Sequence, residues 1–201
     1  MNHLSELDQG LFQFIAGAYK LLLYLAFNYN LFKRGNMMEK ISVVQAVMST
    51  LPHPVALLTS VDAEGKANVM TISWYTFASL KPPTAVFCVS NKSYTNSLIS
   101  KSGSFSLSLP TSKLSEKTLL AGKSHGFDMD KINDIGFEVE DHNGFIAPII
   151  KGSAVAFSLK LLDKMDASDH TVFLAEIVAA VKDNDKKHIY AFDGYTDLHE
   201  L

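Results

Sequence analysis

Short runs of β-forming residues, each ended by turn residues, restrict the folds open to this chain more than any other feature. The run at 105–109 alternates strictly between large apolar residues and serines, as a strand with two different faces does. The runs at 55–61 and 67–74 are separated by Asp-Ala-Glu-Gly-Lys, a hairpin turn in which Gly65 can take a positive φ. These segments predict antiparallel strands joined by tight turns.

The remaining pattern extends this prediction along the chain. Further strands are expected at 84–90, 153–162, 170–181 and 188–192, and short helices at 39–49, 94–102, 113–121 and 128–134. The regular alternation of strand and helix that is typical of a Rossmann sheet is missing. The fold class predicted is therefore mostly β, an antiparallel barrel or sandwich with short flanking helices.

The segment 1–37 differs in composition from the rest of the chain. Its run LFQFIAGAYKLLLYLAFNYNLF is mostly apolar, with Lys20 near its centre. An acidic start does not fit a secretory signal, and a central lysine argues against a membrane span. We expect an extra N-terminal helix outside a functional domain at 38–201, and we do not expect a membrane as partner. A weak membrane helix, a buried or dimer-packing helix, and a start at Met37 or Met38 stay open.

Composition excludes several classes of function. The 201 residues carry a net charge of −3, without the basic surface that nucleic-acid binding requires. The single cysteine, Cys88, lies in an apolar run, which predicts a buried thiol in a reducing compartment and a cytoplasmic protein. The seven histidines show no metal-ligand spacing, so no metal site is predicted.

His170 opens a strand directly after a turn, where an imidazole can donate a hydrogen bond or carry a proton, although a lone histidine is more often structural.

The strand at 67–74 is unusually rich in hydrogen-bonding side chains. Asn68, Thr71 and Ser73 offer donors and acceptors, and Trp74 offers a ring that can stack. Taken singly, each residue is equally well explained by a strand with a solvent-facing polar side and a core tryptophan. Taken together, they suit the edge and the face of a flat heterocycle.

A hydroxyl-rich turn follows the strand that ends at Ser90. Ser93 or Thr95 can cap the helix that begins there, whose free N–H groups and positive dipole end suit a phosphate, and Lys92 adds a charge. A plain capped surface helix is the structural alternative. If the barrel brings this turn beside the polar strand, a heterocycle with a phosphate tail would fit.

The segment 122–131 is loop-like and dense in polar groups. Ser124, His125 and Lys131 could contact a ligand there. The alternative is a loop that leads into a helix capped by Asp128.

The ordered series of segments from about Pro54 to about Tyr195 resembles the flavin reductase-like proteins, an FMN-binding split-barrel family, and is most similar to the flavoredoxin-type branch. The resemblance implies a six-stranded split β-barrel that dimerises, FMN as cofactor, NAD(P)H as reductant and an electron acceptor that the sequence does not name. A non-enzymatic FMN electron carrier, the same barrel with pyridoxal phosphate or haem, and a membrane-associated protein are the alternatives.

The resemblance also assigns site residues. It gives Asn68, Met70, Thr71, Ser73 and Trp74 to the flavin ring, Ser90, Asn91, Lys92, Ser93 and Thr95 to the phosphate, Asp128, Asp130 and Lys131 to further cofactor contacts, and His170 to a catalytic position near flavin and nicotinamide. Two arginines of the family pattern are absent: the phosphate turn has Ser93 and Tyr94, and Phe127 precedes the Asp-x-Asp-Lys segment.

Overall fold

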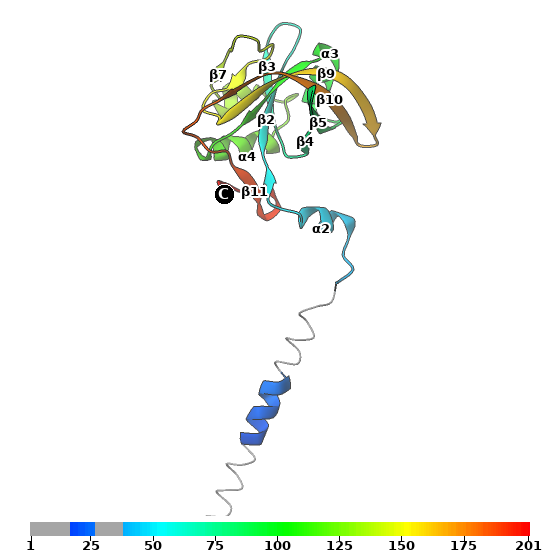
Figure 1. The fold of residues 1–201 in the computed structure, drawn as a ribbon, viewed down its shortest axis with the longest axis vertical. Helices are drawn as coiled ribbons and strands as arrows, with labels where there is room; N and C mark the ends of the chain where they lie inside the picture. Colours follow the sequence, from blue (N-terminus) through cyan, green and yellow to red (C-terminus); the bar gives the residue numbers. More distant parts are fainter. Residues whose placement is uncertain (1–16, 27–37) are drawn as a thin grey trace, which may run out of the picture. The chain divides into compact units, whose positions relative to one another are not determined.

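The computed structural model describes residues 17–26 and 38–201 (Figure 1). Met48–Leu201 forms one compact unit, and the residues before it belong to a second unit. Within that second unit, residues 17–26 are helical and their side chains are exposed. This agrees with the helix expected in 1–37 as far as the described residues reach, and the division of the chain at residue 38 stays a prediction.

Helix α2 (Val43–Met48) is shorter than the expected helix at 39–49. It begins at a reciprocal cap, in which the Gln45 backbone N–H donates to Ser42 Oγ over 3.2 Å and the Ser42 N–H donates to Gln45 Oε1 over 3.0 Å. Within the described ranges, no helix is both long and apolar enough to cross a bilayer. The span considered for the apolar run falls largely on residues outside those ranges.

The main sheet has seven strands among the described residues, in the order β3-β2-β6-β9-β10-β5-β4, and its paired neighbours are antiparallel. The strands are β2 (Ala56–Val61), β3 (Ala67–Ile72), β4 (Tyr75–Leu80), β5 (Pro83–Ser90), β6 (Ser104–Leu109), β9 (Val155–Ala167) and β10 (His170–Lys182). The sheet curls into a split β-barrel, which confirms the predicted fold class.

Smaller elements close the ends of the barrel. They are the strands β1 (His53–Pro54), β11 (Tyr190–Phe192) and β12 (Asp197–His199) of one small sheet, the β7 (Val139–Glu140) and β8 (Ile149–Ile150) pair, the helices α3 (Tyr94–Ser102), α4 (Ser115–Lys123) and α5 (Lys131–Ile135), and the 3₁₀ turns η1 (Ser112–Leu114) and η2 (Asp193–Tyr195). Helix α3 has the predicted bounds. Helices α4 and α5 begin two and three residues later than expected, and the hairpin of β11 and β12 extends beyond the single strand predicted there.

The barrel core forms around three phenylalanines. Phe87, Phe105 and Phe173 are fully buried, and the rings of Phe87 and Phe105 meet edge to face at 5.3 Å. The serine face of β6 is buried too: Ser106 Oγ donates to the Ala147 carbonyl, and Ser108 Oγ accepts from a backbone N–H of β8. The alternation that predicted two different faces therefore reflects an apolar core on one side and hydrogen-bonded loop segments on the other.

Strand β4 was not predicted. The sequence was interpreted as one strand through residue 74 followed by a break at Lys-Pro-Pro, whereas the chain turns back at Lys81–Pro82 to pair β4 with β5. Five of its six residues are exposed, because β4 is the last strand of the sheet. An edge strand of this kind lacks the apolar alternation by which sequence analysis detects strands.

Candidate functional site

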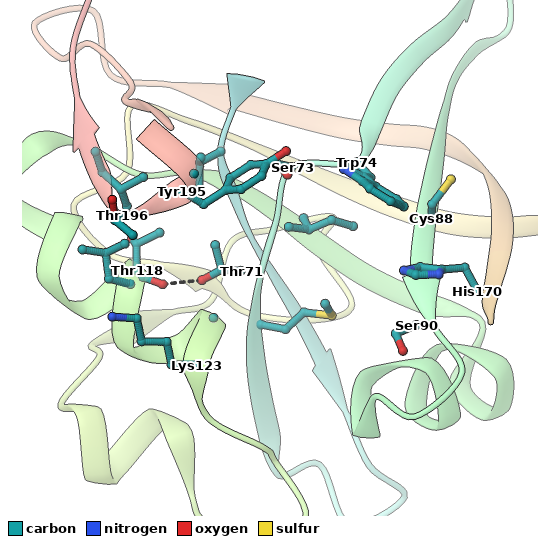
Figure 2. A pocket seen from close by; sticks show the side chains of 17 residues that line it. Thr71, Ser73, Trp74, Cys88, Ser90, Thr118, Lys123, His170, Tyr195 and Thr196 are labelled. Atoms are coloured by element: carbon teal, nitrogen blue, oxygen red, sulfur yellow. Dashed lines mark hydrogen bonds between the residues drawn. The ribbon is translucent and has the colours of Figure 1, made fainter. Parts of the chain in front are cut away.

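A cavity of about 480 Å³ opens beside β3 (Figure 2). We call it the main cavity. Its lining residues come from β3, the end of β5, α4, the start of β10 and the C-terminal turn; they are Val55, Met70, Thr71, Ile72, Ser73, Trp74, Cys88, Ser90, Thr118, Leu119, Gly122, Lys123, His170, Gly194, Tyr195, Thr196 and Leu198. Its volume lies within the range of small-molecule sites.

A smaller cavity of about 180 Å³ adjoins the main cavity, and we call it the side cavity. The two share Met70, Thr71, Ser90 and Gly122 as lining residues. Most of its other lining residues are polar or charged, and they come from the start of α3, the end of α4 and the segment that follows it: Lys92, Ser93, Tyr94, Thr95, Ala121, Ser124, His125, Gly126 and Lys131. The fold thus brings the polar strand beside the hydroxyl-rich turn, as the sequence required for a heterocycle with a phosphate tail.

Strand β3 supplies one wall of the main cavity. Thr71 Oγ1 donates to the carbonyl of Thr118 over 2.5 Å, which ties β3 to α4 (Figure 2). Ser73 and Trp74 follow at the end of the strand, and Trp74 is 43% exposed. The alternative that Trp74 belongs to the core is therefore wrong. Its indole lies 5.2 Å from the His170 ring, with the planes tilted by 30°.

Four of the predicted contact residues line neither cavity: Asn68, Asn91, Asp128 and Asp130. The first two hold neighbouring segments. The buried Asn68 donates from Nδ2 to Thr95 Oγ1 over 2.9 Å, which fixes the first turn of α3. Asn91 donates to the Ser168 carbonyl and accepts from Thr171 Oγ1, both over 2.8 Å. Both amides hold neighbouring segments in this structure, and their expected contacts with ring and phosphate stay predictions.

The N-terminus of α3 faces the side cavity. Ser93 is the cap residue; its Oγ donates to the Met70 sulfur over 3.6 Å and accepts no hydrogen bond from the helix. The Asn96 N–H donates to the Ser93 carbonyl over 3.1 Å, which leaves the N–H groups of Tyr94 and Thr95 and the Lys92 ammonium for a ligand at this wall. The dipole end of this nine-residue helix favours an anion there.

Lys131 is the most buried charged group of the site. The residue is only 5% exposed, and its Nζ donates to the Ala121 carbonyl over 2.8 Å. Burial lowers the pKa of this lysine to about 8, since the charged form loses water. It lines the side cavity, where a bound anion would stabilise the charged form.

Of the two neighbouring aspartates, Asp130 has a structural role. Asp130 caps α5 by accepting from the Asn133 N–H over 3.2 Å, and it forms an ion pair with Lys66 at 3.0 Å. The Lys66 hydrogen bond lowers the pKa of Asp130. Asp128 lines neither cavity, and the alternative in which it caps the helix is wrong, because α5 begins three residues later.

His170 lies opposite Ser90 in the pairing of β10 with β5. The distance between Nδ1 and Asp169 Oδ1 is 2.8 Å, and this hydrogen bond lowers the pKa of Asp169. Because Nδ1 is engaged, Nε2 is the ring nitrogen available to a ligand in the main cavity.

Several lining residues were missed by sequence analysis. Cys88 is half-buried and lines the main cavity, which corrects the expected buried thiol, and burial raises its pKa. The strand period could have placed it, because Cys88 and Ser90 share one face of β5. No local sequence pattern indicated that Thr118 on α4 and Tyr195 on the C-terminal turn would line the cavity. The described residues contain no group of three or more potential metal-ligating side chains.

Comparison with known proteins agrees with this architecture. A family model described as a flavin reductase like domain matches residues 48–199. A flavin reductase from Pseudomonas putida is 27% identical over 153 residues, which cover 75% of this chain and 86% of that protein. An uncharacterized protein from Aeropyrum pernix is 28% identical over 160 residues, which are 79% of this chain but 61% of the relative's length. The crystal structure of flavoredoxin from Methanosarcina acetivorans has the same fold, with a TM-score of 0.73 and 24% identity over 83% of this chain and 92% of that one. The family resemblance is thereby confirmed: the chain belongs to the flavin reductase-like family.

Proposed function

We propose that this protein binds FMN across the main and side cavities and uses NAD(P)H to reduce a flavin. The observation that carries the proposal is the order of groups along the joined cavities. Two lysines, several hydroxyls and a helix N-terminus gather at the side cavity, while the main cavity combines aromatic, sulfur and aliphatic surface with hydroxyls, Lys123 and His170. A flat ring with a phosphate tail matches that order from end to end.

The side cavity would hold the phosphate. The start of α3, Lys92 and the buried Lys131 all line this cavity, and a dianionic phosphate would offset the unfavourable burial of Lys131. Asn68 contributes indirectly, by fixing Thr95 in the first turn of α3.

The main cavity would hold the ring. Met70 and Trp74 offer apolar and aromatic surface, and the backbone and hydroxyls of Thr71 and Ser73 offer hydrogen bonds along the ring edge. When bound, FMN would supply the redox chemistry, in which a hydride from reduced nicotinamide and a proton from solvent give NAD(P)⁺ and the two-electron-reduced flavin.

His170 is the residue we assign to the reaction. Asp169 holds its Nδ1 side, and Trp74 packs against its ring, so its Nε2 side has a defined direction in the cavity. From that position it would orient the nicotinamide or hold a proton beside the ring.

A second candidate is an FMN electron carrier that a partner protein reduces. The observation that favours it is the replacement of two family arginines by aromatic residues. The rings of Tyr94 and Phe127 contact each other at 4.7 Å, and Phe127 is 66% exposed. This pair offers no guanidinium fork to the diphosphate of a nicotinamide dinucleotide.

We also propose that the protein works as a homodimer in the cytoplasm. Strand β4 is an open sheet edge, and it carries Phe77 and Leu80, which are 49% and 84% exposed. An apolar edge of this kind is usually covered in natural proteins. A second copy would cover it close to Trp74, while the cytoplasm would keep the Cys88 thiol reduced.

Oxidation of NADH and NADPH by the purified protein tests the proposal that it is a flavin reductase. With free FMN in excess, the reductase must turn over many equivalents of nucleotide per chain. Tight FMN binding without turnover would assign the carrier function instead. A protein that neither binds FMN nor turns over would contradict both candidates.

A further inference from the structure

The C-terminal turn holds an aromatic side chain in the main cavity at the expense of backbone strain. Asp193, Gly194 and Tyr195 are three consecutive residues with positive φ, at 39°, 66° and 66°. Only the glycine adopts this region readily, so the other two are strained. The hairpin of β11 and β12 holds the turn from both sides, and Thr196 Oγ1 donates to the Asp193 carbonyl over 2.6 Å. Strain of this kind is typical of functional positions.

The Tyr195 side chain is fixed in the cavity wall. Its ring stacks on His53 at 6.2 Å with the planes 11° apart. In Figure 2 the phenol points toward Ser73 at the end of β3. The hydroxyl oxygen is buried and has no hydrogen-bond partner among the described residues.

A second buried hydroxyl in the same wall is unpartnered. Thr118 is fully buried on α4, and no group in the described part of the chain bonds to its Oγ1. Thr118 and Tyr195 both line the main cavity, although they come from separate elements. Six buried side-chain oxygens of the described residues have no partner, and those of Thr118 and Tyr195 are the two among them that line the main cavity. Their shared place in one cavity wall points to polar atoms of a ligand.

We propose that the Tyr195 and Thr118 hydroxyls bind the polar edge of the flavin ring, where carbonyl and N–H groups alternate. The assignment rests on the proposed function. A hydroxyl can donate or accept, which suits such an edge. The neighbouring lining residues Val55, Leu119 and Leu198 are apolar, so this end of the cavity suits a neutral heterocycle rather than the phosphate.

This assignment predicts opposite effects on stability and on binding. In the ligand-free protein each hydroxyl is buried without a partner, so replacing it by an apolar group of the same shape leaves the protein equally stable or more stable. In the complex the same replacement removes a hydrogen bond to the ring and weakens binding. A purely structural residue would instead lower stability when its polar group is removed.

The test compares Tyr195→Phe and Thr118→Val with the natural chain. Tyr190→Phe is the matched control, because it removes a phenol hydroxyl from the same hairpin but lines neither cavity. FMN and riboflavin affinities are measured by quenching of flavin fluorescence, and the urea midpoint is measured without ligand. We expect affinity to fall by about tenfold in Tyr195→Phe and by severalfold in Thr118→Val, equally for both flavins, with unchanged or higher midpoints.

Three results would overturn the assignment while leaving FMN binding by the natural chain intact. They are unchanged affinity in both variants, a lower urea midpoint that accompanies the affinity loss, and a loss confined to FMN, which would point to the phosphate. Failure of the natural chain to bind FMN would instead overturn the proposed function on which the assignment rests.

Discussion

Replacement of Lys131 by methionine separates the roles of the buried ammonium in folding and in ligand binding. The methionine keeps an unbranched apolar stem of similar length but removes the charge and the hydrogen bond to the Ala121 carbonyl. We expect the ligand-free variant to be more stable than the natural protein at pH 7, and to bind FMN more weakly.

The magnitude follows from the lowered pKa. The difference between the ordinary lysine pKa of 10.5 and about 8 in the folded protein corresponds to a burial penalty of about 3 kcal/mol. The lost hydrogen bond to Ala121 offsets about 1 kcal/mol of the gain. A net stabilisation of about 2 kcal/mol at pH 7 is therefore expected for Lys131→Met.

The stability difference between Lys131→Met and the natural protein depends on pH. Between pH 8 and 10.5 the unfolded chain holds a proton on this lysine that the folded chain has released, so the stability of the natural protein rises with pH in that window. Below pH 8 the penalty is fully present, and above 10.5 it is gone. The advantage of Lys131→Met must therefore shrink as pH rises from 8 to 10.5.

Urea unfolding of both proteins at pH 7 and pH 10 measures this difference, with Lys164→Met, at an exposed site on β9, as the control. FMN affinity of the natural protein should also fall across the same window, because the bound phosphate favours the protonated amine, and the variant should lose that dependence. A variant that is less stable at pH 7, or whose advantage does not change with pH, would refute the reasoning.

Three further predictions test other parts of the molecule. An alanine Cβ at Gly126 would collide with Asn68 Oδ1 and lie 2.9 Å from Tyr94 Cδ1, so Gly126→Ala should lower the free energy of unfolding by roughly 1–3 kcal/mol in urea titrations, and an unchanged value would show that the loop relaxes freely. His170→Gln should slow NAD(P)H oxidation by about 100-fold at saturating FMN while the FMN dissociation constant stays within about twofold, and an equal rate would remove His170 from the reaction. Phe77→Glu should convert the expected dimer into monomers in light scattering, and a dimer that persists would exclude β4 from the interface.

The fold could be predicted largely from local patterns. Strands with a buried apolar face, such as β6, and hairpin turns with a glycine carry their signal in the sequence, because side-chain period and turn chemistry are local properties. Strands β4 and β12 lacked that signal. The first is an exposed edge, and the second is short and held by its packing on the barrel.

The candidate site could be predicted only in part. Ser73, Trp74, Lys92, Lys131 and His170 were expected from the polar strand, the turn and the resemblance, and each lines a cavity. The roles of Asn68 and Asn91 depend on partners 27 and 77 residues away, which no local pattern reveals. Tyr195 and Thr118 were missed for the same reason.

The most direct test of the account is a titration of the purified, ligand-free protein with FMN, followed by the visible absorption of the flavin. We expect a band that shifts on binding and saturates at about one FMN per chain, since the main and side cavities together make one site for one ring and one phosphate. A flavin spectrum that stays the same as that of free FMN throughout the titration would contradict it.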